Sequence, residues 1–243
     1  MRLFINELCK IKASRSVKGV VIVFLFFALL SGMVFGAGTT SWPVSRYGFG
    51  APFLWLMGNG AAGFFLYAAI VSGLFASEFE LGVIANALGS GVKRSSYFIA
   101  KVLAVFGACI LIYLGGMGIL FLFKCQTMGF DPTGQIFADY GLKVLVYNAW
   151  AIVSLLSYIA VYIFIACLMR EAVPAFIASL VITIAEMLNL FRGPVRIAMD
   201  AVAFVRDDTV LSPDFPKLFV PCLCLLTAAL GAAYLLFLLQ DVD

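Results

Sequence analysis

The segment SEFELGVIANALGSGVKRSSYFIAK, from Ser77 to Lys101, is the longest stretch of this chain that is both polar and patterned. Long apolar runs flank it on both sides. Of the 243 residues, 64% are hydrophobic and only 12% are charged, whereas about 25% of the residues in an average soluble domain are charged. The composition therefore predicts an all-α integral membrane protein in which this segment connects two spans.

Six apolar runs are long enough to cross a bilayer, which takes about 20 mainly apolar residues per helix. They lie near residues 19–38, 57–77, 102–123, 144–169, 173–191 and 218–239. We therefore expect a single transmembrane domain over residues 1–243 with six spans. The pieces left between the spans are too short to form a soluble catalytic domain.

Basic residues near span ends predict the topology, because they are retained in the cytoplasm. Five Lys or Arg residues precede the first span, one lies in the first connection, and three lie in the second connection, residues 78–101. This asymmetry places the head of the chain and the second connection in the cytoplasm. With six spans, both termini are then cytoplasmic.

The head, residues 1–18, has the pattern of a short amphipathic helix. Phe4, Leu8 and Ile11 recur at helical spacing, while Asn6 and the basic residues occupy other angles. Such a helix can lie in the plane of the lipid headgroups. A plain cytoplasmic anchor of basic residues explains the same charges equally well.

Several kinds of chemistry are excluded by the composition. Histidine is absent, which excludes Ser/His and Cys/His catalysis and His-ligated metals. The six cysteines have no metal-ligand or disulfide spacing. Residues 89–96, GSGVKRSS, look superficially like a phosphate loop, but the chain has no Gly-Lys dipeptide, which that loop requires. We therefore expect neither enzyme activity nor a bound metal or cofactor in this chain.

The second connection predicts a short helix from Glu78 to Leu88. The helix is followed by a turn at Gly89–Gly91, after which Lys93 and Arg94 begin the return to the third span. A helix this apolar needs a cover. It either lies on the membrane surface or docks a partner protein.

This connection resembles the permeases of type-2 ATP-binding-cassette (ABC) transporters. Such permeases have an acidic residue at a span end, a glycine four residues on, a basic residue before the next span and a lysine inside it, here Glu78, Gly82, Arg94 and Lys101. The six spans, the head helix and the cytoplasmic ends agree with the same family. The resemblance implies that the connection docks on separate cytoplasmic ATPase subunits, which bind ATP and Mg²⁺.

The residues that the resemblance assigns to ATPase docking are Glu78, Phe79, Glu80, Gly82, Ile84, Leu88, Arg94 and Lys101. Arg94 and Lys101 would steady the return of the docking helix. The pattern requires only one acid, and Glu80 is a second one. Which of the two, Glu78 or Glu80, contacts the ATPase therefore stays open. The alternative is that these charges are merely interfacial residues that hold the connection in the cytoplasm.

Glu186 is the only ionisable side chain well inside a predicted span, and Asn189 follows on the same face. A charged group at mid-bilayer costs about 3 kcal/mol, so such residues face a partner, a cavity or a path. The resemblance implies that spans two and five border the translocation path, which places Glu186 and Asn189 beside it. The alternatives are a protonated acid bonded to a neighbouring helix and a hydrated acid near the outer surface.

Small residues and one further segment complete the expected architecture. Gly32 and Gly36 lie four residues apart in the first span, and a second cluster lies at Gly115–Gly118 in the third. Such residues allow close helix approach, either between permease subunits or within one chain. Residues 192–217 predict an outer amphipathic or re-entrant helix.

The resemblance implies a permease subunit that pairs with an identical or sibling subunit in the plasma membrane of a bacterium. The pair would form the path for ATP-driven export of a cargo, which would be a peptide (for example an antimicrobial peptide), a lipid or an amphipathic compound. We expect no nucleic-acid partner. Two alternatives stay open. One is the substrate-capturing membrane subunit of a vitamin uptake system, and the other is a non-transporting immunity or assembly protein.

Overall fold

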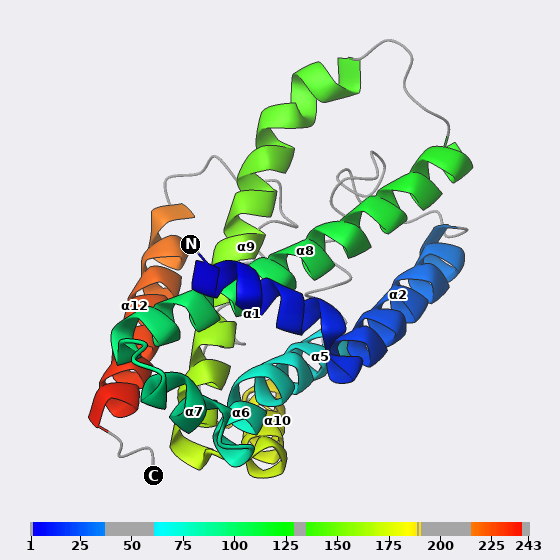
Figure 1. Cartoon of the computed structure of the whole chain (residues 1–243). Coiled ribbons are helices and arrows are strands. Elements are labelled where there is room, and N and C mark those ends of the chain that lie inside the picture. Colours follow the sequence, from blue (N-terminus) through cyan, green and yellow to red (C-terminus); the bar gives the residue numbers. More distant parts are fainter. Residues whose placement is uncertain (1, 37–60, 129–134, 189, 191–214, 240–243) are drawn as a thin grey trace.

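The computed structural model describes residues 2–36, 61–128, 135–188, 190 and 215–239. All regular elements within these ranges are helical (Figure 1), which confirms the all-α class. In chain order they are α1 (Arg2–Ala13), α2 (Arg15–Gly36), α5 (Ala61–Val71), the π-helical turn η1 (Ser72–Ala76), α6 (Ser77–Glu80), α7 (Val83–Gly89), α8 (Arg94–Met128), α9 (Gln135–Met169), α10 (Ala172–Met187) and α12 (Phe215–Leu239).

Each predicted span overlaps a helix of the structure, but fewer helices meet the requirements for crossing a membrane. In the described residues, Arg94–Gly116, Ile152–Met169 and Val220–Leu239 are long and apolar enough. A fourth span arises if the bent pair Phe65–Glu80 and Val83–Gly89 counts as one. The structure therefore supports three or four spans, and the count of six stays a prediction.

The long helices pack as neighbours in one bundle. Helix α12 packs along α9, α2 along α8, and α10 against both α9 and α5 (Figure 1). The described end of α12 lies beside the start of α8, because Arg94 Nη1 donates a hydrogen bond to the Leu238 carbonyl at 3.2 Å.

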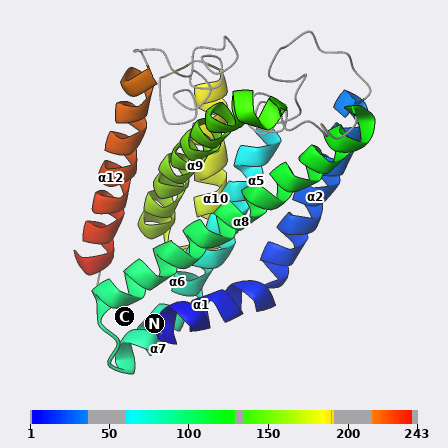
Figure 2. The ribbon, with the colours of Figure 1, turned by 90° about the horizontal axis from the view of Figure 1, so that it is seen from above.

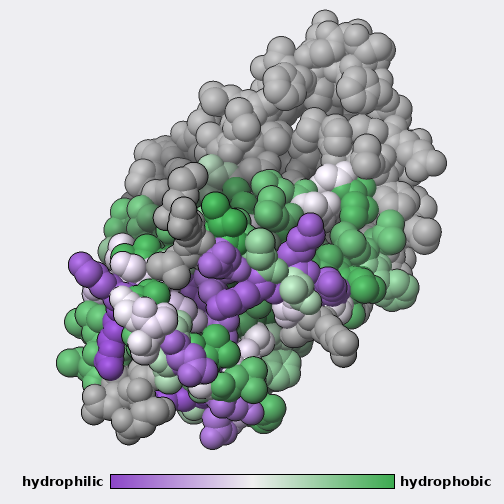
Figure 3. All heavy atoms as spheres, viewed as in Figure 1, coloured by the Kyte–Doolittle hydropathy of each residue, from purple (hydrophilic) through white to green (hydrophobic). Residues whose placement is uncertain are grey.

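One end of the bundle, which we call the polar end, consists of α1, α6, α7 and the first turns of α8 (Figure 2). Figure 3 shows hydrophilic residues gathered over this region, with hydrophobic residues on both sides of it. The beginning of the described chain and the last turn of α12 lie at this same end. That this end is cytoplasmic, and that α1 lies in the headgroup plane, stay predictions.

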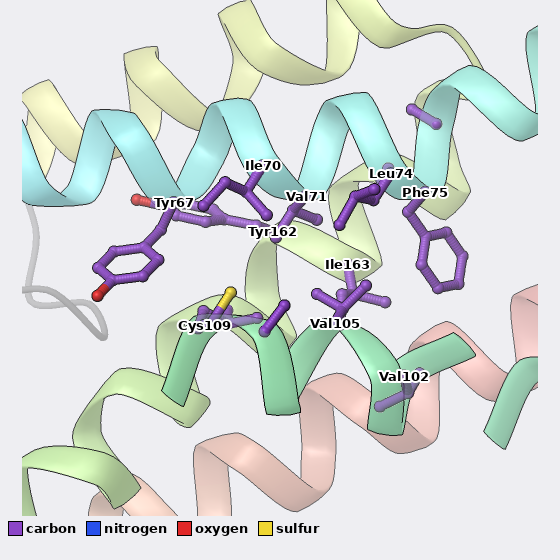
Figure 4. Packing of buried hydrophobic residues seen from close by; sticks show 14 of the residues in the cluster. Tyr67, Ile70, Val71, Leu74, Phe75, Val102, Val105, Cys109, Tyr162 and Ile163 are labelled. Carbon is purple, nitrogen blue, oxygen red and sulfur yellow. The ribbon is translucent and has the colours of Figure 1, made fainter. Parts of the chain in front are cut away.

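The core lies where the second span, formed by α5 and η1, packs against α8 and α9, and it is mainly apolar (Figure 4). It includes Tyr67, Ile70, Val71, Leu74, Phe75, Val102, Val105, Cys109, Tyr162 and Ile163. Because lipid is as apolar as these side chains, close packing rather than exclusion from water stabilises such an interface.

The predicted small-residue contact in the third span occurs at Gly116, within one chain. A Cβ atom on Gly116 would lie 2.5 Å from Cε1 of Phe24 on α2, whereas one on Gly115 would meet nothing within 4 Å. Gly116 therefore lets α2 and α8 approach closely. Gly32 and Gly36 lie on the last turns of α2, whose side-chain surroundings are outside the described residues.

Candidate functional site

The second span changes its helical form as it reaches the polar end. Helix α5 continues into the π-turn η1 and then into α6, and Ser77 Oγ donates a hydrogen bond to the Gly73 carbonyl at 2.6 Å. Single π-turns within α-helices occur frequently at functional sites. The sequence pattern did not predict this turn.

Gly82 separates α6 from α7. Its φ angle is +65°, in the left-handed region, which residues with a side chain rarely adopt. Its N–H donates to the Phe79 carbonyl at 3.1 Å, and the chain bends by 61° between Phe65–Glu80 and Val83–Gly89. The predicted continuous helix from Glu78 to Leu88 is therefore wrong, because a left-handed glycine ends α6 and starts α7 in a new direction.

Four charged side chains from α1, α6 and α8 meet directly behind this bend. Lys101 Nζ lies 2.8 Å from Glu7 Oε2 and 2.7 Å from Glu78 Oε1. Lys10 Nζ lies 2.6 Å from Glu7 Oε1 and 3.6 Å from Glu78 Oε1. The Tyr97 hydroxyl donates a further hydrogen bond to Glu78 Oε2. We call Glu7, Lys10, Glu78 and Lys101 the four-charge cluster.

The four-charge cluster is neutral overall, and three of its four side chains, those other than Lys10, are largely out of solvent. The side chains of Lys101 and Glu7 are 2% and 4% exposed. Charges removed from water are tolerated only when they are paired in good geometry, and the loss of one partner strongly destabilises the fold. The cluster therefore holds α1, α6 and α8 together at the polar end.

The pKa values of two of its members follow from this pairing. Burial alone would raise the pKa of the Glu7 carboxyl, but its hydrogen bonds to Lys10 and Lys101 and their charges outweigh burial and bring the pKa below its ordinary 4.5. For Lys10, burial would lower the pKa, but the hydrogen bond to Glu7 and the charges of Glu78 and Glu7 raise it above its ordinary 10.5. Both groups are therefore charged at neutral pH.

We expect the stabilising effect of Glu7 to depend on pH. Its folded-state pKa lies below the ordinary 4.5, so its contribution is complete above that pH and is lost as pH falls through the folded-state value. Wild type should exceed Glu7→Gln in free energy of unfolding by about 2 kcal/mol at pH 7, a typical value for hydrogen bonds to a charged group.

Chemical denaturation in mixed micelles at pH 7, 5 and 3.5 measures this difference. The gap between wild type and Glu7→Gln should narrow at pH 3.5. The exposed Glu171→Gln is the control and should show no such gap. A gap for Glu7→Gln that stays constant from pH 7 to 3.5 would contradict the account.

The predicted docking residues differ in their accessibility. Ile84 and Lys101 are buried, Glu80 is exposed, and Glu78, Phe79, Gly82, Leu88 and Arg94 are partly buried. Lys101 thus contacts Glu7 and Glu78 inside this chain, and its support for the connection is internal. Glu80 Oε2 accepts a hydrogen bond from the Ala172 N–H at 3.2 Å, which joins α6 to the start of α10.

Sequence reasoning missed three residues of this region. Glu7 and Tyr97 received no role, although Glu7 belongs to the four-charge cluster and Tyr97 donates a hydrogen bond to it. Leu81, which is 72% exposed at the bend, was not among the residues assigned to docking. An acid within the otherwise basic head was the only sequence signal for Glu7.

Glu186 is completely buried within a single subunit. Thr183, one turn earlier on the same face, shares a 2.7 Å hydrogen bond with the Tyr162 hydroxyl of α9. The opposite face of α10 is apolar and exposed, at Val173, Ile177, Val181 and Ile184. Glu186 therefore points into the subunit, and the predicted Asn189 lies outside the described residues.

Apolar helices of spanning length, with a polar end held together by buried charge pairs, define an integral membrane subunit. Residues 3–186 match the family described as ABC-2 family transporter protein. Because the match covers more than half of the chain, the chain belongs to this family and is a permease subunit of an ABC transporter, which associates with ATP-binding-cassette subunits. No curated protein and no solved structure matches the chain.

Proposed function

We propose that this permease subunit exports a peptide, a lipid or an amphipathic compound, driven by ATPase subunits that dock on α6 and α7. ATP and Mg²⁺ bind to those partner subunits. A second permease subunit, identical or sibling, completes the path and packs at Gly32 and Gly36 of α2.

The observation that carries this proposal is the four-charge cluster. Glu78 lies at the start of the docking segment, and its carboxylate is bound by Lys101 of α8 and lies beside Lys10 of α1. A displacement of α6 by a partner is therefore passed to two other helices and is not absorbed by a flexible loop. This arrangement suits a segment that receives mechanical work.

The surface available to the partner is centred on the bend. Leu81 is an exposed apolar side chain at the polar end, and α7, with its exposed Asn86, is the outermost helix there (Figure 2). An apolar side chain beside polar groups is the usual composition of an interface anchor and its rim.

We expect Leu81→Arg to reduce the ATPase that copurifies with the permease by about tenfold, because a buried interface anchor contributes about 1–2 kcal/mol or more. Ser96→Arg is the matched control, since it adds the same charge at another exposed position of the polar end. Quantitative mass spectrometry of the purified complex gives the ratio of ATPase to permease. A well-folded Leu81→Arg complex with the wild-type ratio would refute docking at the bend.

We also propose that Glu186 takes part in cargo passage or gating. In support, it is a buried acid one turn from the hydrogen-bonded Thr183 and Tyr162 pair, and acids at membrane depth are generally functional. Glu186→Gln should lower cargo-stimulated ATPase activity and flatten its pH dependence, because it removes the acid that we propose takes part in passage or gating.

Reconstituted complexes supplied with a panel of amphipathic peptides and lipids give this measurement, with Glu171→Gln as the control. Activity and pH dependence equal to wild type would remove Glu186 from the mechanism.

Accumulation of cargo in inside-out vesicles distinguishes export from import. The family assignment favours the permease over the vitamin-capturing subunit and the immunity or assembly protein.

A further inference from the structure

An N–H group in the first turn of α10 donates its hydrogen bond to a residue on another helix. The helix begins at Ala172, and its N-cap residue, Glu171, makes no side-chain capping bond. The N–H of Ala175 bonds back to the Glu171 carbonyl at 3.2 Å, while Pro174 has no N–H to offer. The N–H groups before Pro174 have no acceptor within the helix and need one from elsewhere.

Glu80 of α6 supplies this acceptor. Its Oε2 lies 3.2 Å from the Ala172 nitrogen, although the two residues are 92 positions apart. A carboxylate at this position satisfies an N–H group and interacts favourably with the positive end of the helix dipole. The neighbouring turn η1 also packs against α10. The second span therefore contacts α10 in two places, through η1 and through Glu80 of α6 (Figure 1).

We infer that Glu80 is the positioning residue that transmits movement of the docking segment to α10. The inference rests on the proposed function, in which the partner ATPase moves α6 and α7. An α-helix rises about 1.5 Å per residue, so α10 carries a displacement at Ala172 over about 21 Å to Glu186. Glu80 thus connects the ATPase side of the subunit to the buried acid in its interior.

This role differs from direct contact with the ATPase. An interface residue would lose the partner when replaced, whereas a transmitting residue keeps the partner and loses the response of α10. Glu171 provides a matched control, because it is an exposed acid at the same helix start that makes no capping bond.

Hydrogen–deuterium exchange on the complete permease–ATPase complex in nanodiscs, with and without the analogue ATPγS, separates these roles without any cargo. In wild type, the nucleotide should change exchange both in residues 83–91, at α7, and in residues 170–180, at α10. In Glu80→Ala, the first-turn amides of α10 should exchange about fivefold faster without nucleotide, the effect of losing a typical cap. The nucleotide response of α10 should fall by at least about half, while the response of α7 and the ATPase content stay at wild-type levels.

Glu80→Gln, which keeps an oxygen acceptor, should show a smaller loss, and Glu171→Ala should behave as wild type. A wild-type response of α10 in Glu80→Ala would overturn the inference, and loss of the ATPase from that variant would overturn it by assigning Glu80 to the interface. If α7 of the wild-type complex showed no nucleotide response, the proposed docking would fail, and this inference with it.

Discussion

Lys101→Met should lower the free energy of unfolding of the purified permease by about 3–5 kcal/mol, the range for removing one partner of a buried ion pair. The substitution leaves the Glu7 and Glu78 carboxylates close together and largely buried. Among the described residues, Lys10, which is 45% exposed, is then the one cation that faces both acids. Chemical denaturation in mixed micelles measures the effect, and the ATPase content of the complex should fall with it.

Two further variants show whether charge imbalance is the cause. Lys93→Met removes an exposed lysine of the same connection and should change stability by less than about 0.5 kcal/mol, as surface substitutions usually do. Adding Glu7→Gln to Lys101→Met leaves Lys10 opposite Glu78 and should recover part of the lost stability. Equal stability of Lys101→Met and Lys93→Met would contradict the account of the cluster.

Gly82→Ala should reduce the ATPase that copurifies with the permease by about fivefold to tenfold or more, because a left-handed backbone costs a residue with a side chain about 1–2 kcal/mol. A Cβ atom at Gly82 meets nothing within 4 Å, so the cost comes from the backbone alone. Relief of this strain turns α7 away from the position in which it docks, while the remaining bundle stays folded.

Gly89→Ala is the matched control for the glycine substitution. Gly89 is the last residue of α7, and a Cβ atom there also meets nothing within 4 Å. Because alanine favours a helix more than glycine does, this variant should keep the wild-type ATPase ratio. If Gly82→Ala and Gly89→Ala behaved alike, the left-handed joint would have no part in docking.

The helices themselves could be predicted from composition and from the length of the apolar runs. A segment in lipid must satisfy its backbone hydrogen bonds internally, so a run such as 102–123 is enough to indicate a helix. The runs did not show that α8 begins as early as Arg94. Its first turns carry Tyr97 and Lys101, whose polar groups bond to partners on other helices and look like a connection in the sequence.

The candidate site could be predicted only where its signal is local. The spacing of Glu78, Gly82 and Lys101 marked the connection, but the partner of Lys101, Glu7, lies 94 residues away, and no periodicity links the two. Gly82 counted as a motif position, although a glycine inside a helical pattern also signals a possible break. The face that Glu186 presents depends on how α10 packs on α9, which the apolar pattern of α10 does not determine.

Site-specific photocrosslinking tests the central claim most directly. A benzoylphenylalanine residue is placed at Leu81, and, as the control, at Leu103, an exposed apolar position within the spanning part of α8. After irradiation of cells and purification of the permease, mass spectrometry identifies the adducts. The account predicts an ATP-binding-cassette ATPase crosslinked at position 81 and none at position 103. Absence of the ATPase at position 81, or equal capture at both positions, would contradict it.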